Sequence, residues 1–290
     1  MVRLRAKALG VVRMLRLKNC LMIGFGVVVG ETIALGGGFN LTYALLGFFT
    51  AFLLMAATMA LNDYFDLEVD LVNNSTKPIP SGIVSLREAV AYALILSFLS
   101  LALAWLINPY CLAIALLALL LMVYYNAAGK KTGFFGNLVV SCCVALPFIF
   151  GGFAVGDVKL VLWFFTLLAF LSNVGREVAK GIVDVKGDAA KNIRTIAATH
   201  GGSIAAKVAV LFFVSSVALS PLPWMLGLVS ILYLPFVLLS DAGFIYSSLS
   251  LPRNFTPKNA ESTKNMVLVW MLLGLVAFLA GSYRYPIHLA

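Results

Sequence analysis

The sequence predicts an all-α protein, a multi-pass bundle of about nine transmembrane helices, and three observations support this fold class. The 290-residue chain is 62% hydrophobic and only 11% charged, with a mean hydropathy of +1.00, whereas soluble domains average about half apolar and a quarter charged residues. Its apolar runs are close to the roughly 20 residues that a helix needs to cross a bilayer. Its basic residues fall in alternate loops between these runs. The runs are 19–36, 41–61, 89–107, 110–125, 138–156, 160–175, 203–219, 222–246 and 266–282.

The basic residues of the chain are distributed unevenly. All of the 21 Lys and Arg residues except Lys159 and Arg284 lie on one side of a nine-span arrangement. Because cytoplasmic loops carry the excess of Lys and Arg, we expect a cytoplasmic N-terminus and an external C-terminus. The net charge of +9 is then explained by membrane topology together with an anionic ligand, and not by nucleic acid. We expect a multi-pass protein of the cell membrane.

The second span runs directly into the stretch NDYFDLEVD, which contains four acidic residues. A carboxylate at a membrane boundary is costly and usually functional. In a helix that continues through the stretch, Asn62, Asp66 and Asp70 lie within roughly 80° of arc, with Asp63 beside them and Glu68 pointing away. Amide and carboxylate oxygens are hard ligands of the kind that Mg²⁺ accepts. This helix face is therefore a candidate metal site.

A second acidic stretch, REVAKGIVDVKGD, ends the sixth span. Asp184 and Asp188 are four residues apart, which places them one turn apart on the same helix face. They follow Asp66 and Asp70 by the same offset, 118 residues in each case. Two acidic faces that open on the same side of a membrane would clamp divalent cations between them.

The constant offset indicates a weak internal repeat. We interpret the chain as one membrane domain, 1–290, with pseudo-repeat halves of roughly 1–128 and 129–290. Two such halves are expected to face one cavity.

Basic side chains surround both acidic stretches on the predicted cytoplasmic side. Carboxylates that hold Mg²⁺, combined with cations that neutralise the remaining oxygens, bind metal-bridged phosphate. A diphosphate on a lipid would place its head group at this boundary and its tail between apolar helices. The basic residues concerned are Lys77, Lys130, Arg176, Lys180 and Arg194.

The stretches NDYFDLEVD and DVKGD resemble the two aspartate-rich motifs of the UbiA superfamily of intramembrane prenyltransferases. The likeness continues in RLKN at the first span, KPIPSG after the first motif, YNAAGKKTGFFGN before the fifth span, and the IRT after the second motif. Within the superfamily, the chain is most similar to archaeal enzymes of ether-lipid synthesis. The resemblance implies nine helices with both motifs on the cytoplasmic side. It also implies Mg²⁺-dependent transfer of a geranylgeranyl group from its diphosphate to the hydroxyl of geranylgeranylglyceryl phosphate, with release of diphosphate.

The resemblance assigns roles to individual residues. The carboxylates and Asn62 would position Mg²⁺ on the diphosphate, and the cations would take up charge as the C–O bond breaks. The catalytic residues that it implies are Asp66, Asp70, Asp184, Asp188 and Tyr125. The implied metal ligands are Asn62, Asp63, Asp66, Asp70, Asp184 and Asp188. The residues implied in binding diphosphate or phosphate are Asn62, Lys77, Lys130, Lys180, Arg194, Arg16 and Asn19.

Tyr125 has two interpretations. Its ring face could stabilise an allylic cation by about 0.5–2 kcal/mol, or it could belong to the belt of aromatic residues at the membrane interface. The chain also departs from the family pattern at three positions, where Gly181 and Lys186 stand in place of acidic residues and Lys77 in place of an arginine. These changes make the surroundings of the second motif more basic.

Two alternative functions remain open from the sequence. The first is a UbiA-type enzyme that prenylates an aromatic acceptor such as 4-hydroxybenzoate or naphthoate in quinone synthesis. An aromatic acceptor needs stacking, whereas a phosphorylated lipid needs additional cations. The second is a secondary transporter, for which intramembrane carboxylates and repeats are also typical. The carboxylates of this chain cluster at one membrane boundary and not at the midplane, which favours the enzyme.

Overall fold

The computed structural model of the protein describes residues 2–38, 40–73, 76–190 and 193–283, and within these ranges the chain is helical without strands. Nine helices in the described part are long and apolar enough to cross a membrane, which confirms the predicted fold class. They are α2 (Leu17–Ala34), α3 (Leu41–Phe65), α5 (Leu86–Ile107), α6 (Pro109–Ala127), α7 (Phe134–Ala154), α8 (Leu160–Val183), α11 (Gly202–Leu219), α13 (Tyr233–Arg253) and α14 (Pro257–Ser282).

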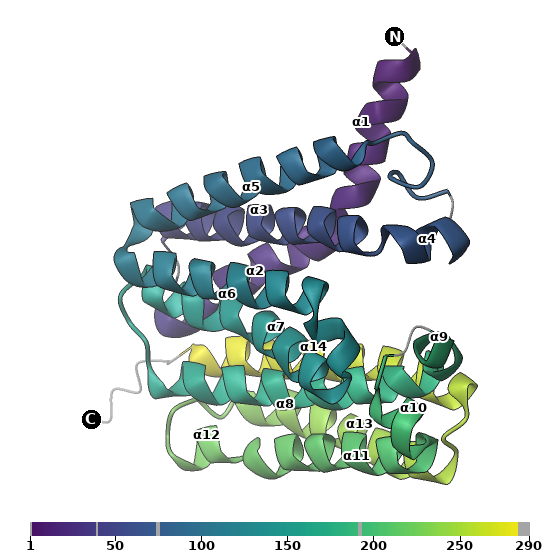
Figure 1. Cartoon of the computed structure of the whole chain (residues 1–290). Coiled ribbons are helices and arrows are strands. Elements are labelled where there is room, and N and C mark those ends of the chain that lie inside the picture. Colours follow the sequence, from purple (N-terminus) through teal and green to yellow (C-terminus); the bar gives the residue numbers. More distant parts are fainter. Residues whose placement is uncertain (1, 39, 74–75, 191–192, 284–290) are drawn as a thin grey trace.

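Shorter elements lie at the ends of the bundle (Figure 1). The helices α4 and α9 follow α3 and α8 at one end, together with α10, whereas α12 lies at the opposite end (Figure 1). These elements are α1 (Val2–Leu15), α4 (Leu67–Asn73), the 3₁₀ turn η1 (Gly129–Thr132), α9 (Val185–Ala190), α10 (Ile196–His200) and α12 (Leu222–Met225). Both acidic stretches therefore lie at the same end of the molecule.

The eighth span differs from the prediction. The expected run 222–246 is interrupted by the short helix α12 and a turn in which Gly227 has φ +67°, and the spanning helix begins only at Tyr233. Pro221 and Pro223 lack the backbone N–H that would bind within a helix, and glycine permits the left-handed turn. The next connection is correspondingly shorter, because α13 continues to Arg253 and α14 starts at Pro257.

The helices that surround the candidate site pack closely. Helix α2 packs on α3 and α7, α3 packs on α6, and α7 packs on α8. The contact of α2 with α7 depends on Gly151, where a Cβ atom would lie only 2.2 Å from the carbonyl oxygen of Val27. Small residues at helix interfaces permit such close approach in membranes. This packing brings α2, α3, α6 and α7 around one cavity, to which α8 contributes Glu177 and Lys180.

Candidate active site

The first acidic stretch is not one continuous helix, so the expectation of a single straight acidic face is wrong in this respect. Helix α3 ends at Phe65, Asp66 adopts φ −87° and ψ 2°, and α4 begins at Leu67. The polar side chains of the stretch fall into two groups. Asn62 and Asp66 line the cavity between α2, α3, α6 and α7, whereas Asp63 and Asp70 are buried, at 3% and 7% exposure, and face Lys77.

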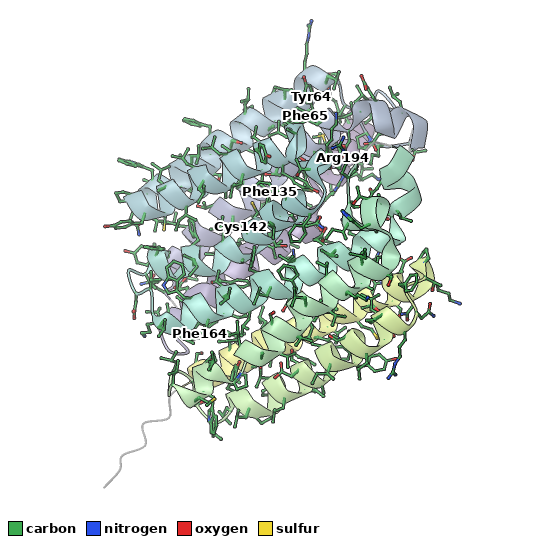
Figure 2. The ribbon with its side chains drawn as sticks, turned by 60° about the horizontal axis from the view of Figure 1, so that its bottom comes forward. Tyr64, Phe65, Phe135, Cys142, Phe164 and Arg194 are labelled. Atoms are coloured by element: carbon green, nitrogen blue, oxygen red, sulfur yellow. The ribbon has the colours of Figure 1, made fainter. Side chains whose placement is uncertain are left out.

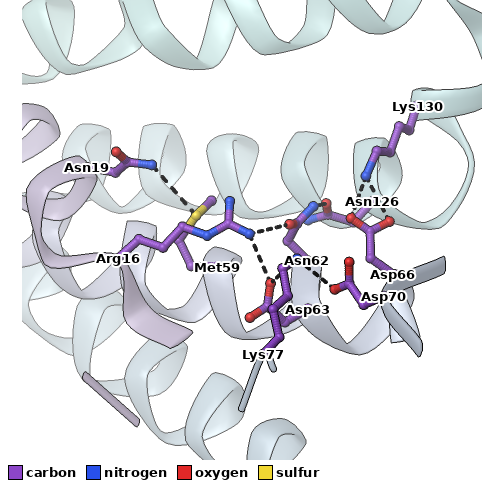
Figure 3. Close-up of polar contacts among 10 residues, drawn as sticks. All are labelled: Arg16, Asn19, Met59, Asn62, Asp63, Asp66, Asp70, Lys77, Asn126 and Lys130. Atoms are coloured by element: carbon purple, nitrogen blue, oxygen red, sulfur yellow. Dashed lines mark hydrogen bonds and ion pairs between the residues drawn. The ribbon is translucent and has the colours of Figure 1, made fainter. Parts of the chain in front are cut away.

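Two cations neutralise the buried pair of carboxylates (Figure 3). Lys77 Nζ lies 2.6 Å from Asp70 Oδ2 and 3.6 Å from Asp63 Oδ1. Arg16 Nη2 donates to Asp63 Oδ1 at 2.9 Å and to Asn62 Oδ1 at 3.2 Å. A buried carboxylate requires such partners, because desolvation without them costs several kcal/mol. The cluster fastens the segment after the first motif, and the junction of α1 and α2, to helix α3.

Arg16 reaches this cluster from an unusual backbone conformation. It separates α1 from α2 and has φ +50° and ψ +60°, and it is the only non-glycine residue with positive φ in the described part of the chain. Left-handed backbone costs a non-glycine residue about 1–3 kcal/mol and persists where other contacts determine it. The two hydrogen bonds of the guanidinium group supply such contacts.

Asp66 and Asn62 are held by polar side chains of η1 and α6. Lys130 Nζ lies 2.8 Å from Oδ1 and 2.5 Å from Oδ2 of Asp66, and Asn62 Nδ2 donates to Asn126 Oδ1 at 3.0 Å (Figure 3). Lys130 belongs to η1 and Asn126 to the last turn of α6. Two side chains that lie 64 positions further along the sequence thus hydrogen-bond to residues of the first motif.

The second acidic stretch repeats this local structure at the same offset. Helix α8 ends at Val183, Asp184 adopts φ −90° and ψ 4°, and α9 begins at Val185. Each of these three positions lies 118 residues after its counterpart around Asp66. In both stretches the break occurs at an aspartate, and the backbone N–H of the next aspartate of the motif donates to its carbonyl oxygen, at 2.8 Å for Asp70 and 2.9 Å for Asp188.

Two adjoining cavities connect the motifs. The first has a volume of about 450 Å³ and extends from Asp66 into the apolar interior of the bundle. The second, of about 500 Å³, contains Asp184 and Asp188. The residues that line both cavities are Tyr125, Lys130, Glu177 and Lys180. Carboxylates from both motifs therefore line two cavities that adjoin at these four residues, and the first cavity extends from basic and polar side chains at Asp66 to apolar ones at its depth.

Glu177 and Asn126 are site residues that the sequence did not reveal. Glu177 is the only acidic residue that lines both cavities in the described part of the chain. Its side chain is 11% exposed and lies between two cations, Arg176 at 2.9 Å and Lys180 at 3.3 Å. Within REVAK these neighbours suggest an ordinary ion pair on a helix surface, so only the position of the cavity distinguishes Glu177. Asn126 follows Tyr125 directly, and its signals were its polar character at the end of an apolar run and its place in the stretch YNAAGKKTGFFGN that carries the family resemblance.

The remaining predicted residues lie at different distances from the cavity. Asn19 lines it and contacts Met59 Sδ at 4.0 Å through Nδ2. Tyr125 lines both cavities, and its ring packs near Gly136 of α7. Arg194 has an exposed side chain and lies at the same end of the molecule as Tyr64 of the first motif (Figure 2). The backbone N–H of Arg194 donates to the carbonyl oxygen of Lys131 at 3.3 Å, which joins the segment after the second motif to η1.

The oxygen-rich donor set of the site fits a divalent cation. Asn62, Asp66, Asp184 and Asp188 present amide and carboxylate oxygens to the joined cavities, and hard oxygen ligands are those that Mg²⁺ prefers. Among the described residues, no three acidic, His or Cys side chains converge on a single point. The carboxylates lie instead in two adjoining cavities, Asp66 in the first and Asp184 and Asp188 in the second, an arrangement suited to a cation that also takes oxygen ligands from a phosphate.

A membrane-embedded bundle with two acidic motifs and several cations at the mouth of an apolar cavity defines an enzyme that handles a lipid phosphate. Comparison with known proteins agrees with this class. The sequence profile of the UbiA prenyltransferase family matches residues 23–273. The chain belongs to the UbiA prenyltransferase family, and it is a multi-pass membrane protein and a prenyltransferase.

Individual relatives specify the likeness further. The chain is 39% identical over 275 residues to the digeranylgeranylglyceryl phosphate synthase of Archaeoglobus fulgidus. The aligned residues cover 93% of this chain and 94% of the relative. A solved structure of a digeranylgeranylglyceryl phosphate synthase matches with a TM-score of 0.86 and 30% identity, over 98% of this chain and 100% of the other. A UbiA homologue from Archaeoglobus fulgidus, solved with GPP and Mg²⁺, shares the fold at a TM-score of 0.70 and 19% identity, over 93% and 99% of the two chains.

Proposed function

We propose that the protein transfers a geranylgeranyl group from geranylgeranyl diphosphate to the free hydroxyl of geranylgeranylglyceryl phosphate, and so forms the second ether bond of an archaeal membrane lipid. The observation that carries this proposal is the pair of adjoining cavities that places carboxylates of both acidic motifs next to a deep apolar cavity. The relatives named digeranylgeranylglyceryl phosphate synthase support the choice of substrates.

The donor diphosphate binds at the cavity mouth in this proposal. Mg²⁺ would be held by Asn62, Asp66, Asp184 and Asp188, with Asp63 and Asp70 behind the first two, and it would neutralise charge on the diphosphate oxygens. Lys130 and Lys180 line the mouth and would contact the leaving group directly. Preorganised charges of this kind usually contribute more to catalysis than any other single effect.

Ether formation then requires one bond to break and one to form. The C1–O bond of the donor breaks and its electron pair leaves with the diphosphate, while the acceptor hydroxyl oxygen bonds to C1 and its proton is released. The allylic cation that develops at C1 lies next to Tyr125 in this proposal. A tyrosine face stabilises a cation by about 0.5–2 kcal/mol, and the apolar walls below exclude water.

The phosphate of the acceptor needs cations that the donor does not use. Arg16 and Asn19 line the cavity mouth on the α2 side, and Lys77 and Arg194 lie on the segments that follow the two motifs. We propose that these residues bind the acceptor phosphate or stabilise the loops that enclose it. Because the mouth carries most of the basic residues, it faces the cytoplasm in this account.

The test is a transfer assay with the purified protein in detergent. The protein is incubated with labelled geranylgeranyl diphosphate, Mg²⁺ and either geranylgeranylglyceryl phosphate, 4-hydroxybenzoate or a naphthoate. We expect label in the lipid ether alone and loss of product when EDTA removes the metal. Label found only in an aromatic product would overturn the lipid-ether function and favour the quinone-type enzyme.

A further inference from the structure

The deep end of the apolar cavity is lined by side chains from α2, α3, α6 and α7, with Thr50 of α3 and Ile114 of α6 one residue beyond the two alanines named next. Val27 of α2, Ala51 of α3, Ala115 of α6 and Phe150 of α7 all line the cavity. They are 0%, 9%, 2% and 4% exposed and belong to one buried hydrophobic cluster. We refer to these four residues as the floor layer.

Packing beyond the floor layer leaves no continuation of the cavity along α3. At Gly47, one helical turn past Ala51, a Cβ atom would lie 2.7 Å from Val27 Cγ1 and 3.5 Å from Phe150 Cε1. Glycine is therefore needed at this position for the side chains of the floor layer to pack against α3. The cavity ends at a packed wall formed by Val27 and Phe150.

The depth of the cavity follows from the helices that line it. The hydrogen bond between Asn62 and Asn126 joins α3 to α6 at the mouth. Ala51 on α3 and Ala115 on α6 each lie eleven residues below this bond. At 1.5 Å of rise per residue, both helices give a depth of about 17 Å.

This depth corresponds to a particular length of isoprenoid chain. An extended polypeptide advances about 3.3–3.6 Å over three main-chain bonds, so an extended isoprene unit of four bonds spans roughly 4.6 Å. Three units then reach about 14 Å, four units about 18 Å and five units about 23 Å by the same measure. A chain of four units fills the cavity to the floor layer, three units leave a void, and a fifth unit has no room.

We propose that the floor layer sets the chain length of the donor, with Ala51 and Ala115 as the residues whose small side chains admit the fourth isoprene unit. This inference rests on the proposed function, because it takes the apolar cavity as the site of the donor tail. It assigns selectivity for a C20 donor to two alanines that lie far from the diphosphate.

The experiment measures binding of non-hydrolysable thiolodiphosphate analogues with C10, C15, C20 and C25 chains, in the presence of Mg²⁺, by calorimetry. The wild-type protein is expected to bind the C20 analogue most tightly. In Ala51→Phe, the ring occupies the place of the last isoprene unit, so the ratio of the C20 to the C15 dissociation constant should rise on the order of a hundred-fold. Ala115→Leu intrudes less, from a different helix, and should raise the same ratio roughly ten-fold.

A matched control lies on the outer face of α6. Leu117 is 48% exposed and does not line the cavity, so Leu117→Phe should leave the ratio unchanged. An unchanged ratio in both alanine variants, or equal weakening of all four analogues in them, would overturn the proposal. Because binding of the analogues needs no acceptor, these results are separate from the transfer assay. A wild-type protein that shows the C20 optimum but prenylates no glycerol lipid would contradict the proposed acceptor and leave the floor layer intact.

Discussion

Replacement of Asp66 by asparagine tests the link between the first motif and catalysis. The change keeps the size of the side chain and removes one negative charge from the cavity mouth, where Lys130 Nζ now lies 2.5 and 2.8 Å from the two carboxylate oxygens. If Asp66 holds the cation that neutralises the diphosphate, its loss should lower the rate of diphosphate release by about 10²–10³-fold, the effect of removing one preorganised electrostatic group.

The effect on stability should be much smaller. The side chains of Asp66 and Lys130 are 21% and 32% exposed, so their ion pair is neither fully buried nor fully solvated. Its loss should cost about 1–2 kcal/mol, between the values typical of surface and buried pairs. Thermal unfolding in detergent therefore separates a catalytic loss from a folding defect. Glu68→Gln is the matched control, because Glu68 is an exposed carboxylate two residues away, and we expect its rate to stay within about two-fold of wild type.

A double-mutant cycle with Lys130→Met distinguishes the two possible roles of Asp66. If Asp66 only neutralises Lys130, then Asp66→Asn should have no further effect in the Lys130→Met background. We expect instead that it lowers the rate of diphosphate release by roughly a further thirty-fold, because the carboxylate acts on the metal–diphosphate complex. Full activity of Asp66→Asn, or no additional loss in the double mutant, would refute this reasoning.

Three further predictions concern positions around the site. Glu177→Gln should lower the rate of diphosphate release by about 10–100-fold, because a carboxylate between two cations orients them at the junction of the cavities; unchanged steady-state kinetics would contradict this role. Arg16→Ala should lower the unfolding free energy in detergent by about 1–3 kcal/mol, since it removes a partner from a buried carboxylate; an unchanged denaturation midpoint would count against the cluster. Gly133→Ala should destabilise the protein by several kcal/mol, since φ is +65° and a Cβ atom would lie 1.8 Å from the Arg194 carbonyl oxygen. Gly82→Ala, with φ +73° and nothing within 4 Å of its Cβ position, is the control and should cost only about 1 kcal/mol; equal melting shifts would exclude the steric explanation.

The nine spans could be predicted from the sequence because their lengths of apolar residues match the bilayer. The eighth was placed too early, since hydropathy does not register a turn made by two prolines and a glycine in an apolar segment. The breaks at Asp66 and Asp184 could not be predicted in the same way. Neither aspartate has a neighbouring glycine or proline in the sequence, and Asp66 at the first break contacts Lys130, 64 positions away.

The correspondence between the two acidic motifs could be predicted because their aspartates repeat at a fixed offset. The contacts between distant segments could not be predicted from the sequence. The offset of 118 residues identified Asp66 and Asp184 as counterparts, and the same offset recurs in their backbone conformations. The sequence could not show that Asp70 forms an ion pair with Lys77 and does not line the cavity. It also assigned no role to Glu177, whose local ion pairs conceal a position between two cavities.

The central claim is that both acidic motifs hold one metal–diphosphate complex. It is tested most directly by a structure of the protein with Mn²⁺ and the C20 thiolodiphosphate, in which anomalous scattering locates the metal. We expect metal in the adjoining cavities, with carboxylate oxygens of Asp66 and of Asp184 or Asp188 at about 2.1 Å from a metal ion. The diphosphate oxygens should complete the coordination and connect the two motifs. Metal bound at one motif alone, or a diphosphate bound outside these cavities, would contradict the account.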